Sequence, residues 1–294
     1  MMPKVSVVIP TYNNAALLPE TLDGVRRQTF TDFEVVVVDD GSTDDTAQVV
    51  RRYDPSIRYA RQENRGPAAA RNAGVSLARG EFIAFCDHDD IWNEQHLERL
   101  TACFAEYPQA AMCFDNAEGF GGTTDGEVHI NRKVAASMIG KKVPIIRLWH
   151  CWVASMSVVM VRKAVFEKLG GLHPDIWGLD DLHFYLRLGA EYEVRYVDYV
   201  GCKKRTAPDN LLRQTGLTGL IRCLEDIKQN HSNVVRAVGP RKLRHRLARC
   251  YRKLGERHRQ SGERRQAREL FCKAFKEDPC QLRALWSYWF HFRR

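Results

Sequence analysis

Short apolar runs alternate with amphipathic segments along the first third of the chain. Residues 5–9 and 33–38 are rich in β-branched side chains and show little alternation between apolar and polar positions, which is typical of strands buried on both faces of a sheet. Between these runs, apolar residues recur at helical spacing over residues 15–28. The order strand, loop, helix, strand therefore predicts an α/β fold, with a mostly parallel sheet flanked by helices.

Later patterns extend this layout. Because ligands of parallel α/β sheets bind beyond the carboxyl ends of the strands, the polar loops that follow each strand form the expected site. Further strands are expected near residues 57–59, 82–85, 111–114 and 158–161, helices near 66–74, 164–169 and 182–188, and a mobile loop in the glycine-rich stretch 119–126.

An acidic cluster follows the expected strand at 82–85. Asp87, Asp89 and Asp90 place three carboxylates within four residues. Asp87 and Asp89 point to one side of an extended backbone, and paired carboxylates suit a hard divalent cation such as Mg²⁺ or Mn²⁺. Acidic residues at strand ends also cap helices, and Asp90 before Ile91 has the position for that role. On these residues alone, a metal site and a helix cap are equally good interpretations.

A second acidic pair, Asp180 and Asp181, begins a segment whose apolar residues repeat at helical spacing. Carboxylates at a helix start interact favourably with the helix dipole, so N-capping is the preferred interpretation of this pair by itself. In combination with the cluster at 87–90, the pair becomes a candidate for catalysis.

The composition is ordinary for a soluble protein, with 44% apolar and 28% charged residues in a chain of 294. A chain of this length can bury a sizeable core. No signal-like segment or apolar membrane span is visible, so we expect a cytosolic protein. The nine cysteines form no Cys-x-x-Cys pair, which argues against a disulfide framework or a structural zinc site.

The net charge of +9 is unevenly distributed along the chain. Residues 236–294 carry 18 Lys or Arg against 5 Asp or Glu, whereas residues 1–235 carry 27 against 31. The basic segment lacks recognisable nucleic-acid-binding signatures, so we expect no nucleic acid partner. An anionic membrane surface or an acidic partner fits this charge better, and the former would give a peripheral location on the cytoplasmic face of a membrane.

The chain from residue 211 onward is helical in pattern. We expect two domains, an α/β domain at 1–210 and a basic helical tail at 211–294. The tail has the spacing of one tetratricopeptide-like repeat, and a single repeat cannot form a solenoid. We therefore expect the tail to pack on the α/β domain or on a second copy in a homodimer. Residues 282–294 mix aromatic and basic side chains, as an interfacial helix or a helix docked in a core groove would. The spacing of one tetratricopeptide-like repeat is matched by Tyr251, Leu254, Gly255, Gly262, Ala267, Phe271, Ala274 and Pro279.

Four separated motifs resemble, in order, those of family 2 inverting glycosyltransferases of the GT-A fold. The resemblance implies a GT-A fold and a metal-dependent reaction that moves a sugar from a nucleoside diphosphate sugar, of the UDP or dTDP type, to a hydroxyl group. A glycan or a lipid-linked glycan of the cell envelope would be the acceptor, in polysaccharide biosynthesis. The motifs are residues 5–13, 36–42, 66–74 with 82–92, and 170–188, so that the resemblance covers about residues 4–190.

The resemblance also implies roles for individual residues. Asp89 corresponds to the carboxylate that binds Mn²⁺ or Mg²⁺ on the pyrophosphate, with Asp87 beside it toward the ribose or sugar. Asp181 corresponds to the general base, and Asp180 replaces the Glu that usually precedes it. Asp40, in preference to Asp39, is expected to accept a hydrogen bond from the base. The residues implied to line the nucleotide-sugar site are Pro10, Thr11, Tyr12, Asn13, Asp39, Asp40, Arg71, Asn72, Asp87 and His88.

The sequence departs from the family pattern near the end of the expected catalytic domain. Many family members carry a His there, whereas this chain has Lys203, Lys204 and Arg205. These cations are expected to hold the diphosphate in place of a third metal ligand. Residues 149–152 lie where acceptor-side groups are expected, and the aromatic side chains among them either stack on a sugar or, as the preferred alternative, pack in the core.

A sugar nucleotidyltransferase, a dehydrogenase and a non-catalytic protein are the three alternatives to a glycosyltransferase. A sugar nucleotidyltransferase or a dehydrogenase needs a glycine-rich loop after the first strand, and residues 10–13 contain no glycine. The third alternative belongs to another class, a non-catalytic scaffold. In it, the α/β domain binds a nucleotide sugar or nothing, and the basic tail recruits a partner.

Overall fold

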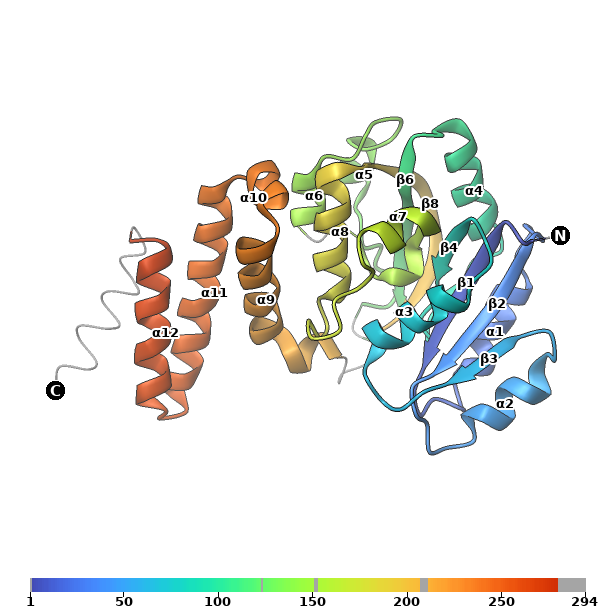
Figure 1. Cartoon of the computed structure of the whole chain (residues 1–294), viewed down its shortest axis with the longest axis horizontal. Coiled ribbons are helices and arrows are strands. Elements are labelled where there is room, and N and C mark those ends of the chain that lie inside the picture. The colour runs from blue at the N-terminus through green and yellow to red at the C-terminus, as the bar shows by residue number, and fades with distance from the viewer. Residues whose placement is uncertain (1, 123, 151–152, 207–210, 280–294) are drawn as a thin grey trace. The chain divides into compact units, whose positions relative to one another are not determined.

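The computed structural model describes residues 2–122, 124–150, 153–206 and 211–279. The chain divides into two compact units. The first consists of residues 1–175 and 180–210, and the second of residues 176–179 and 211–294. The first unit holds the sheet, whereas the long segment of the second unit is helical (Figure 1).

One sheet dominates the first unit, with strand order β3-β2-β1-β4-β7-β6-β8-β5. β1, β2, β3 and β4 are parallel, β7 is antiparallel to both β4 and β6, and β6 is parallel to β8. The carboxyl ends of β1, β2, β4, β6 and β8 therefore point toward one edge of the sheet, which confirms the predicted fold class. The strands are β1 (Val5–Thr11), β2 (Phe33–Asp39), β3 (Arg58–Arg61), β4 (Phe82–Phe85), β5 (Ile91–Trp92), β6 (Ala110–Phe120), β7 (Val159–Arg162) and β8 (Glu193–Arg205).

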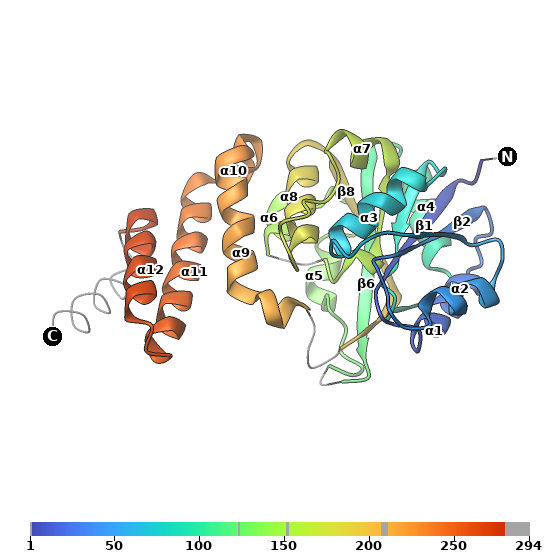
Figure 2. The same cartoon turned by 60° about the horizontal axis from the view of Figure 1, so that its bottom comes forward.

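Helices cover both faces of this sheet. Figure 2 shows α3 on one side of β1 and β2 and α1 on the other, as right-handed connections between parallel strands require. Gly74 of α3 lies against Val8 of β1 so closely that a Cβ there would overlap the valine side chain. The helices are α1 (Leu18–Arg26), α2 (Thr46–Tyr53), α3 (Pro67–Leu77), α4 (His96–Glu106), α5 (Arg132–Ala136), α6 (Ile145–Trp149), the 3₁₀ turn η1 (Met156–Val158), α7 (Lys163–Lys168) and α8 (Asp180–Glu191).

The glycine-rich stretch after residue 118 makes backbone hydrogen bonds within itself, and its expected mobility stays a prediction. The Gly119 amide donates to the Glu127 carbonyl over 2.9 Å, and the Gly126 amide donates to the Gly119 carbonyl over 2.9 Å. β6 consequently continues through Phe120, beyond the strand expected near 111–114. Small residues allow the two chain segments to approach here, since a Cβ on Gly119 would overlap Thr124.

The second unit contains α9 (Leu211–Asn230), α10 (Ser232–Val238), α11 (Pro240–Gln260) and α12 (Arg264–Glu277). α11 and α12 form an antiparallel pair whose turn includes Gly262 at a φ of +80°. Phe271 of α12 packs where Gly255 of α11 has no side chain. The predicted helical character of the tail is confirmed over the described residues, and its assignment as one tetratricopeptide-like repeat stays a prediction. None of the described helices combines the length and apolar character of a membrane span.

A buried polar pair lies between α4 and the sheet. His96 Nδ1 is 2.7 Å from Asp115 Oδ2, and both side chains are completely buried. Gly201 of β8 lies against this pair, and a Cβ at that position would overlap both partners. The pair can therefore form only because residue 201 lacks a side chain.

We predict that Gly201→Ala destabilises the protein by about 3 kcal/mol or more, because the methyl group would separate two buried polar groups. Among the described residues, the remaining side-chain atoms His96 Nε2 and Asp115 Oδ1 have no other hydrogen-bond partner. The free energy of unfolding in urea measures the effect. Gly126→Ala is the control, since Gly126 has a φ of +73° but no atom near its absent Cβ. We expect this control to cost only about 1 kcal/mol of backbone strain. Equal losses in the two variants would contradict the steric argument.

Candidate active site

The first acidic cluster follows β4 at the edge of the sheet and is held in place by hydrogen bonds to η1. The amide of Asp87 donates to Ser157 Oγ over 2.9 Å, and Trp92 Nε1 donates to the Ser157 carbonyl over 2.7 Å. Ser157 is completely buried. It was not identified from the sequence, since a serine near an apolar run gives no signal of its own. Its two hydrogen bonds fix the turn that carries the cluster.

Arg71 of α3 joins the two acidic motifs. Its Nη2 lies 2.6 Å from Asp87 Oδ1, and its Nη1 lies 3.1 Å from Asp180 Oδ2. Burial lowers the pKa of Arg71, but the two carboxylates more than offset this, so the pKa is raised and the guanidinium stays charged. Arg71 thus brings the first turn of α8, with Asp180 and Asp181, to the cluster after β4.

The carboxylates after β4 have different pKa values, because they are not equally compensated by positive charge. Burial raises the pKa of Asp87, but Arg71 more than compensates, so that the pKa lies below its ordinary value. Burial raises the pKa of Asp89, and burial with the charges of Asp87 and Asp89 raises the pKa of Asp90 to about 8. The cluster therefore lacks positive charge, and a divalent cation would supply it.

The pair at the start of α8 lies in a similarly desolvated environment. Burial raises the pKa of Asp180 to about 7, although Arg71 opposes the shift. Burial also raises the pKa of Asp181, whose Oδ1 accepts a hydrogen bond of 2.6 Å from the Leu182 amide. Asp181 is half-buried, whereas Asp180 is buried. An ionised carboxylate with a raised pKa is a better proton acceptor than one at its ordinary value.

Two cations reach the site from the carboxyl end of β8. Arg205 donates from its backbone amide to Asp90 Oδ1 over 3.0 Å and from Nε to the Asp89 carbonyl over 3.1 Å. Lys204 donates from Nζ to the Ala154 carbonyl over 2.6 Å. The Lys204 charge also contributes to the lowered pKa of Asp87. It partly opposes the rise that burial causes in the pKa of Asp90 and Asp181. The charge of Lys204 therefore acts on carboxylates of both acidic motifs.

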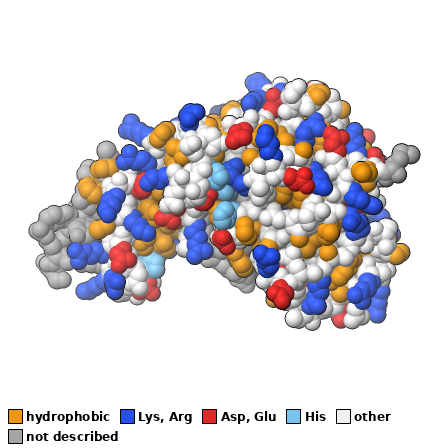
Figure 3. Space-filling model, viewed as in Figure 1, with side chains coloured by type: hydrophobic (Ala, Val, Ile, Leu, Met, Phe, Trp, Pro, Cys, Tyr) orange, Lys and Arg blue, Asp and Glu red, His pale blue; other side chains and the backbone are white. Residues whose placement is uncertain are grey.

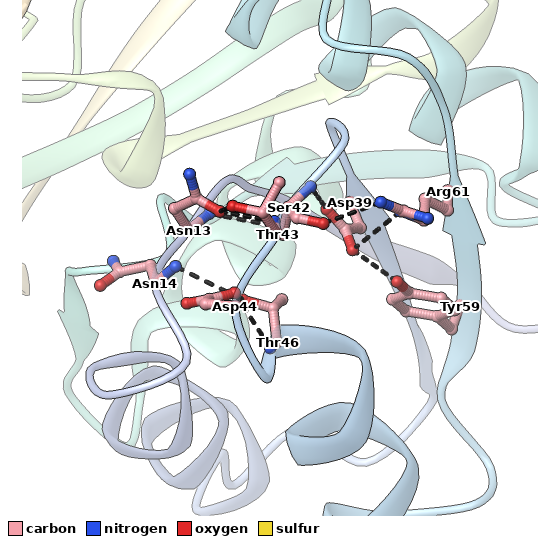
Figure 4. Close-up of polar contacts among 9 residues, drawn as sticks. All are labelled: Asn13, Asn14, Asp39, Ser42, Thr43, Asp44, Thr46, Tyr59 and Arg61. Atoms are coloured by element: carbon pink, nitrogen blue, oxygen red, sulfur yellow. Dashed lines mark hydrogen bonds and ion pairs between the residues drawn. The ribbon is translucent and has the colours of Figure 1, made fainter.

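The loops after β1 and β2 bind each other (Figure 4). Asn13 has a φ of +47°, and its Oδ1 accepts a hydrogen bond of 2.7 Å from the Thr43 amide. Its own amide donates to Ser42 Oγ over 2.9 Å. Asp39 accepts hydrogen bonds from the Ser42 amide over 2.7 Å and from the Tyr59 hydroxyl over 2.5 Å. These contacts give the loop that would face a nucleotide a fixed shape.

Asp40 supports the next loop in the same way. It accepts hydrogen bonds from Gln62 Nε2 over 2.7 Å, the Arg65 amide over 3.0 Å and the Gly66 amide over 2.8 Å. Gly66 immediately precedes α3 and has a φ of +86°. Asp40 thereby positions the helix that carries Arg71, and its contact with a base stays a prediction.

Other predicted site residues have structural partners as well. Asn72 donates from Nδ2 to the Leu172 carbonyl over 2.8 Å and accepts from the Leu172 amide over 2.9 Å. His88 Nδ1 lies 3.2 Å from the Pro10 carbonyl, so the loops after β1 and β4 also touch. Tyr12 is 45% exposed, which leaves its ring available to a ligand.

The predicted acceptor-side segment is divided. Trp149 is the last residue of α6 and is buried, as expected for core packing, whereas His150 is exposed. Cys151 and Trp152 lie outside the described residues.

The residues present fit a divalent cation. Asp87 and Asp89 offer the carboxylate oxygens that Mg²⁺ and Mn²⁺ prefer. Among the described residues, no other side chain donates a hydrogen bond to the Asp89 carboxylate, so its oxygens are available to a cation. The negative charges of Asp87 and Asp89 also raise the pKa of Asp90, which is consistent with a cluster that would gain from a bound cation.

A mixed α/β sheet whose parallel strands end in acidic motifs, with a further acidic helix start held beside them, is the architecture of GT-A glycosyltransferases. The family model described as "Glycosyl transferase family 2" matches residues 6–170, and the chain belongs to that family. The family prediction made from the sequence is thereby confirmed.

Curated relatives carry the same description. The uncharacterized glycosyltransferase YwdF of Bacillus subtilis is 30% identical over 202 residues, which cover 66% of this chain and 71% of the relative. An uncharacterized glycosyltransferase of Rickettsia felis is 44% identical over 97 residues, which are 32% of this chain and 16% of the relative. The chain therefore matches only a small part of this second, longer protein.

Solved structures share the fold. TarS 1-349 of S. aureus in complex with UDP aligns with a TM-score of 0.68 and 22% identity, over 96% of this chain and 83% of TarS. The mannosyltransferase PcManGT of Pyrobaculum calidifontis in complex with GDP-Man and Mn²⁺ aligns with a TM-score of 0.61 and 19% identity, over 100% and 83%. At these identities the likeness establishes the fold.

We predict that Arg71→Met destabilises the protein by about 3 to 5 kcal/mol at pH 8, because two buried carboxylates lose their counter-ion. Without Arg71, burial would raise the folded-state pKa of Asp87 from below to above its unfolded value, and that of Asp180 further above it. Folding then favours their protonated forms, so the loss should be small near pH 4 and should grow as the pH rises. Urea unfolding at several pH values measures it.

The double variant Arg71→Met/Asp180→Asn is the matched control for charge. Removing one uncompensated carboxylate should recover part of the lost stability at pH 8 and little near pH 4. A loss in Arg71→Met that is the same at every pH would show that packing, and not charge balance, is the role of Arg71.

Proposed function

We propose that this chain is an inverting glycosyltransferase that depends on a divalent metal ion and transfers a sugar from a nucleoside diphosphate sugar to a hydroxyl group. The observation that carries the proposal is the pair of ion contacts of Arg71, 2.6 Å to Asp87 and 3.1 Å to Asp180. They hold a candidate base, Asp181, beside a candidate metal cluster in a chain of glycosyl transferase family 2. These are the two groups that the reaction needs.

The donor site is proposed at the carboxyl ends of β1, β2 and β4. Asp89 and Asp87 would hold Mn²⁺ or Mg²⁺, which supplies Lewis-acid stabilisation of the departing diphosphate. The fold is shared with TarS in complexes with UDP and UDP-GlcNAc and with PcManGT in complex with GDP-Man and Mn²⁺, which supports a nucleotide-sugar donor with a divalent ion. The nucleotide sugar would lie against Pro10, Thr11, Tyr12, Asn13, Asp39, Asp40, Arg71, Asn72 and His88.

Asp181 is proposed as the general base. It would accept the proton of the acceptor hydroxyl while the hydroxyl oxygen bonds to the anomeric carbon and the bond from that carbon to the diphosphate oxygen breaks. A single displacement of this kind inverts the anomeric configuration. Asp180, bound to Arg71, would keep the first turn of α8 in place for this step. We propose a glycan or lipid-linked glycan of the cell envelope as the acceptor.

Lys204 is proposed to bind the diphosphate through its positive charge. Its charge acts on Asp87, Asp90 and Asp181, which lie in both acidic motifs. Its Nζ is held by the Ala154 carbonyl, so it is not neutralised by a carboxylate hydrogen bond. A fixed cation close to a leaving group stabilises charge that develops during transfer.

We predict that Asp181→Asn lowers kcat by about 10²- to 10⁴-fold, since the amide cannot accept the proton. Nucleotide binding should survive, because the donor contacts are unchanged. A thermal-shift panel of UDP, dTDP and GDP with their sugars, each with and without Mn²⁺, measures binding separately from turnover. Asp89→Ala should weaken both activity and metal-dependent stabilisation. Full activity in Asp181→Asn would remove Asp181 from the mechanism.

We predict that Lys204→Ala lowers kcat/KM by roughly ten- to a hundredfold, through lost electrostatic stabilisation of the diphosphate. Lys203→Ala is the matched control, because adjacent residues of a strand point to opposite faces and Lys203 is exposed. Steady-state kinetics of both variants and the wild type give the comparison. Equal effects of the two substitutions would reduce the role of Lys204 to one of net charge.

A further inference from the structure

α11 is much more basic than its packing requires. Over Pro240–Gln260 it carries nine Lys or Arg residues and a single acidic residue, Glu256. The face that packs in the second unit is apolar, with Leu243, Leu247 and Tyr251 buried. Basic residues are therefore not distributed at random around the helix, and one face must display most of them.

Four of these residues form a row along the exposed face of α11. Lys242, Arg249, Lys253 and Arg257 are separated by seven, four and four residues, which places them within about 80° of one another around a helix of 3.6 residues per turn. All four side chains are exposed. At about 1.5 Å per residue, the row is roughly 22 Å long. We call these four residues the basic row.

The basic row is not neutralised by the rest of the described second unit. Some other cations of this unit have acidic partners: Lys228 lies 2.5 Å from Glu277, and Arg252 lies 2.8 Å from Glu256. Within the described residues, no ion pair involves any member of the basic row. Glu256, the acidic residue of α11, is already bound by Arg252. Figure 3 shows Lys and Arg side chains at the surface of the second unit.

We propose that the basic row is a docking site for an anionic phospholipid bilayer. A straight row of exposed cations on a single helix matches a flat, uniformly negative surface, to which each Lys or Arg adds roughly fivefold in affinity. The chain after α12 carries Trp286, Trp289 and Phe292 among arginines. Aromatic and basic residues together are typical of membrane interfaces and give a bilayer, in preference to a nucleic acid, as the partner.

The experiment is co-sedimentation of the full-length protein with vesicles of phosphatidylcholine alone or with 30% phosphatidylglycerol added, the composition being about that of a strongly anionic membrane. The test variant carries Lys242→Glu, Arg249→Glu, Lys253→Glu and Arg257→Glu. The control carries Arg51→Glu, Arg52→Glu, Lys141→Glu and Lys142→Glu, four exposed residues of the first unit, so that both variants change net charge equally. Circular dichroism checks that both remain helical.

We expect the wild type and the control to bind only the anionic vesicles. Because salt screens the attraction between exposed charges, about 0.5 M salt should reduce this binding. The basic-row variant should bind at least about tenfold less, given the contribution of each cation to surface affinity. Unchanged binding of this variant, or equal losses in both variants, would overturn the proposal. Absence of vesicle binding, with a labelled DNA duplex bound through the same four residues, would overturn it in favour of nucleic acid.

Discussion

The contacts of Arg71 are the constraint on which the candidate active site depends. Arg71 is only 8% exposed, so its charge is strongly desolvated and is stable only if it is balanced locally. Asp87 and Asp180 provide that balance from two parts of the chain. Because each of the three groups would be destabilising without the others, the ion contacts fix α3, the end of β4 and the start of α8 in one arrangement.

The remaining polar contacts of the site fix the loops around that arrangement. Asp40 orders the approach to α3, and Asn72 on α3 holds the backbone of Leu172 by a donor and an acceptor at once. Ser157 holds the turn of Asp87 from the opposite side. Because these groups already have hydrogen-bond partners, few of them would have to move when a ligand binds. The site is thus preorganised. Within the cluster after β4, the carboxyl groups of Asp89 and Asp90 have raised pKa values and are the least compensated by positive charge.

The first half of the sheet could be predicted because its strands are continuous apolar runs. β1 and β2 read directly from residues 5–9 and 33–38, and the order of motifs then indicated the family. β8 was missed because polar residues such as Glu193, Arg195 and Asp198 interrupt its pattern, as expected for a strand that is not buried on both faces. The acidic motifs could be found by residue type. The partners of Arg71 and the role of Ser157 could not, because they depend on contacts between residues far apart in sequence.

The separation of 109 residues between Arg71 and Asp180 has a consequence for synthesis on the ribosome. Strands β1 to β4 and α3 leave the ribosome together and can begin to pack, since their contacts are comparatively local. Asp180 is translated about a hundred residues after Arg71, and until then the buried guanidinium has one of its two counter-ions. The nascent chain therefore acquires the parallel strands β1 to β4 before its candidate site. The ion contacts of that site are completed only when α8 has been translated, and the sheet only when β8 has followed it.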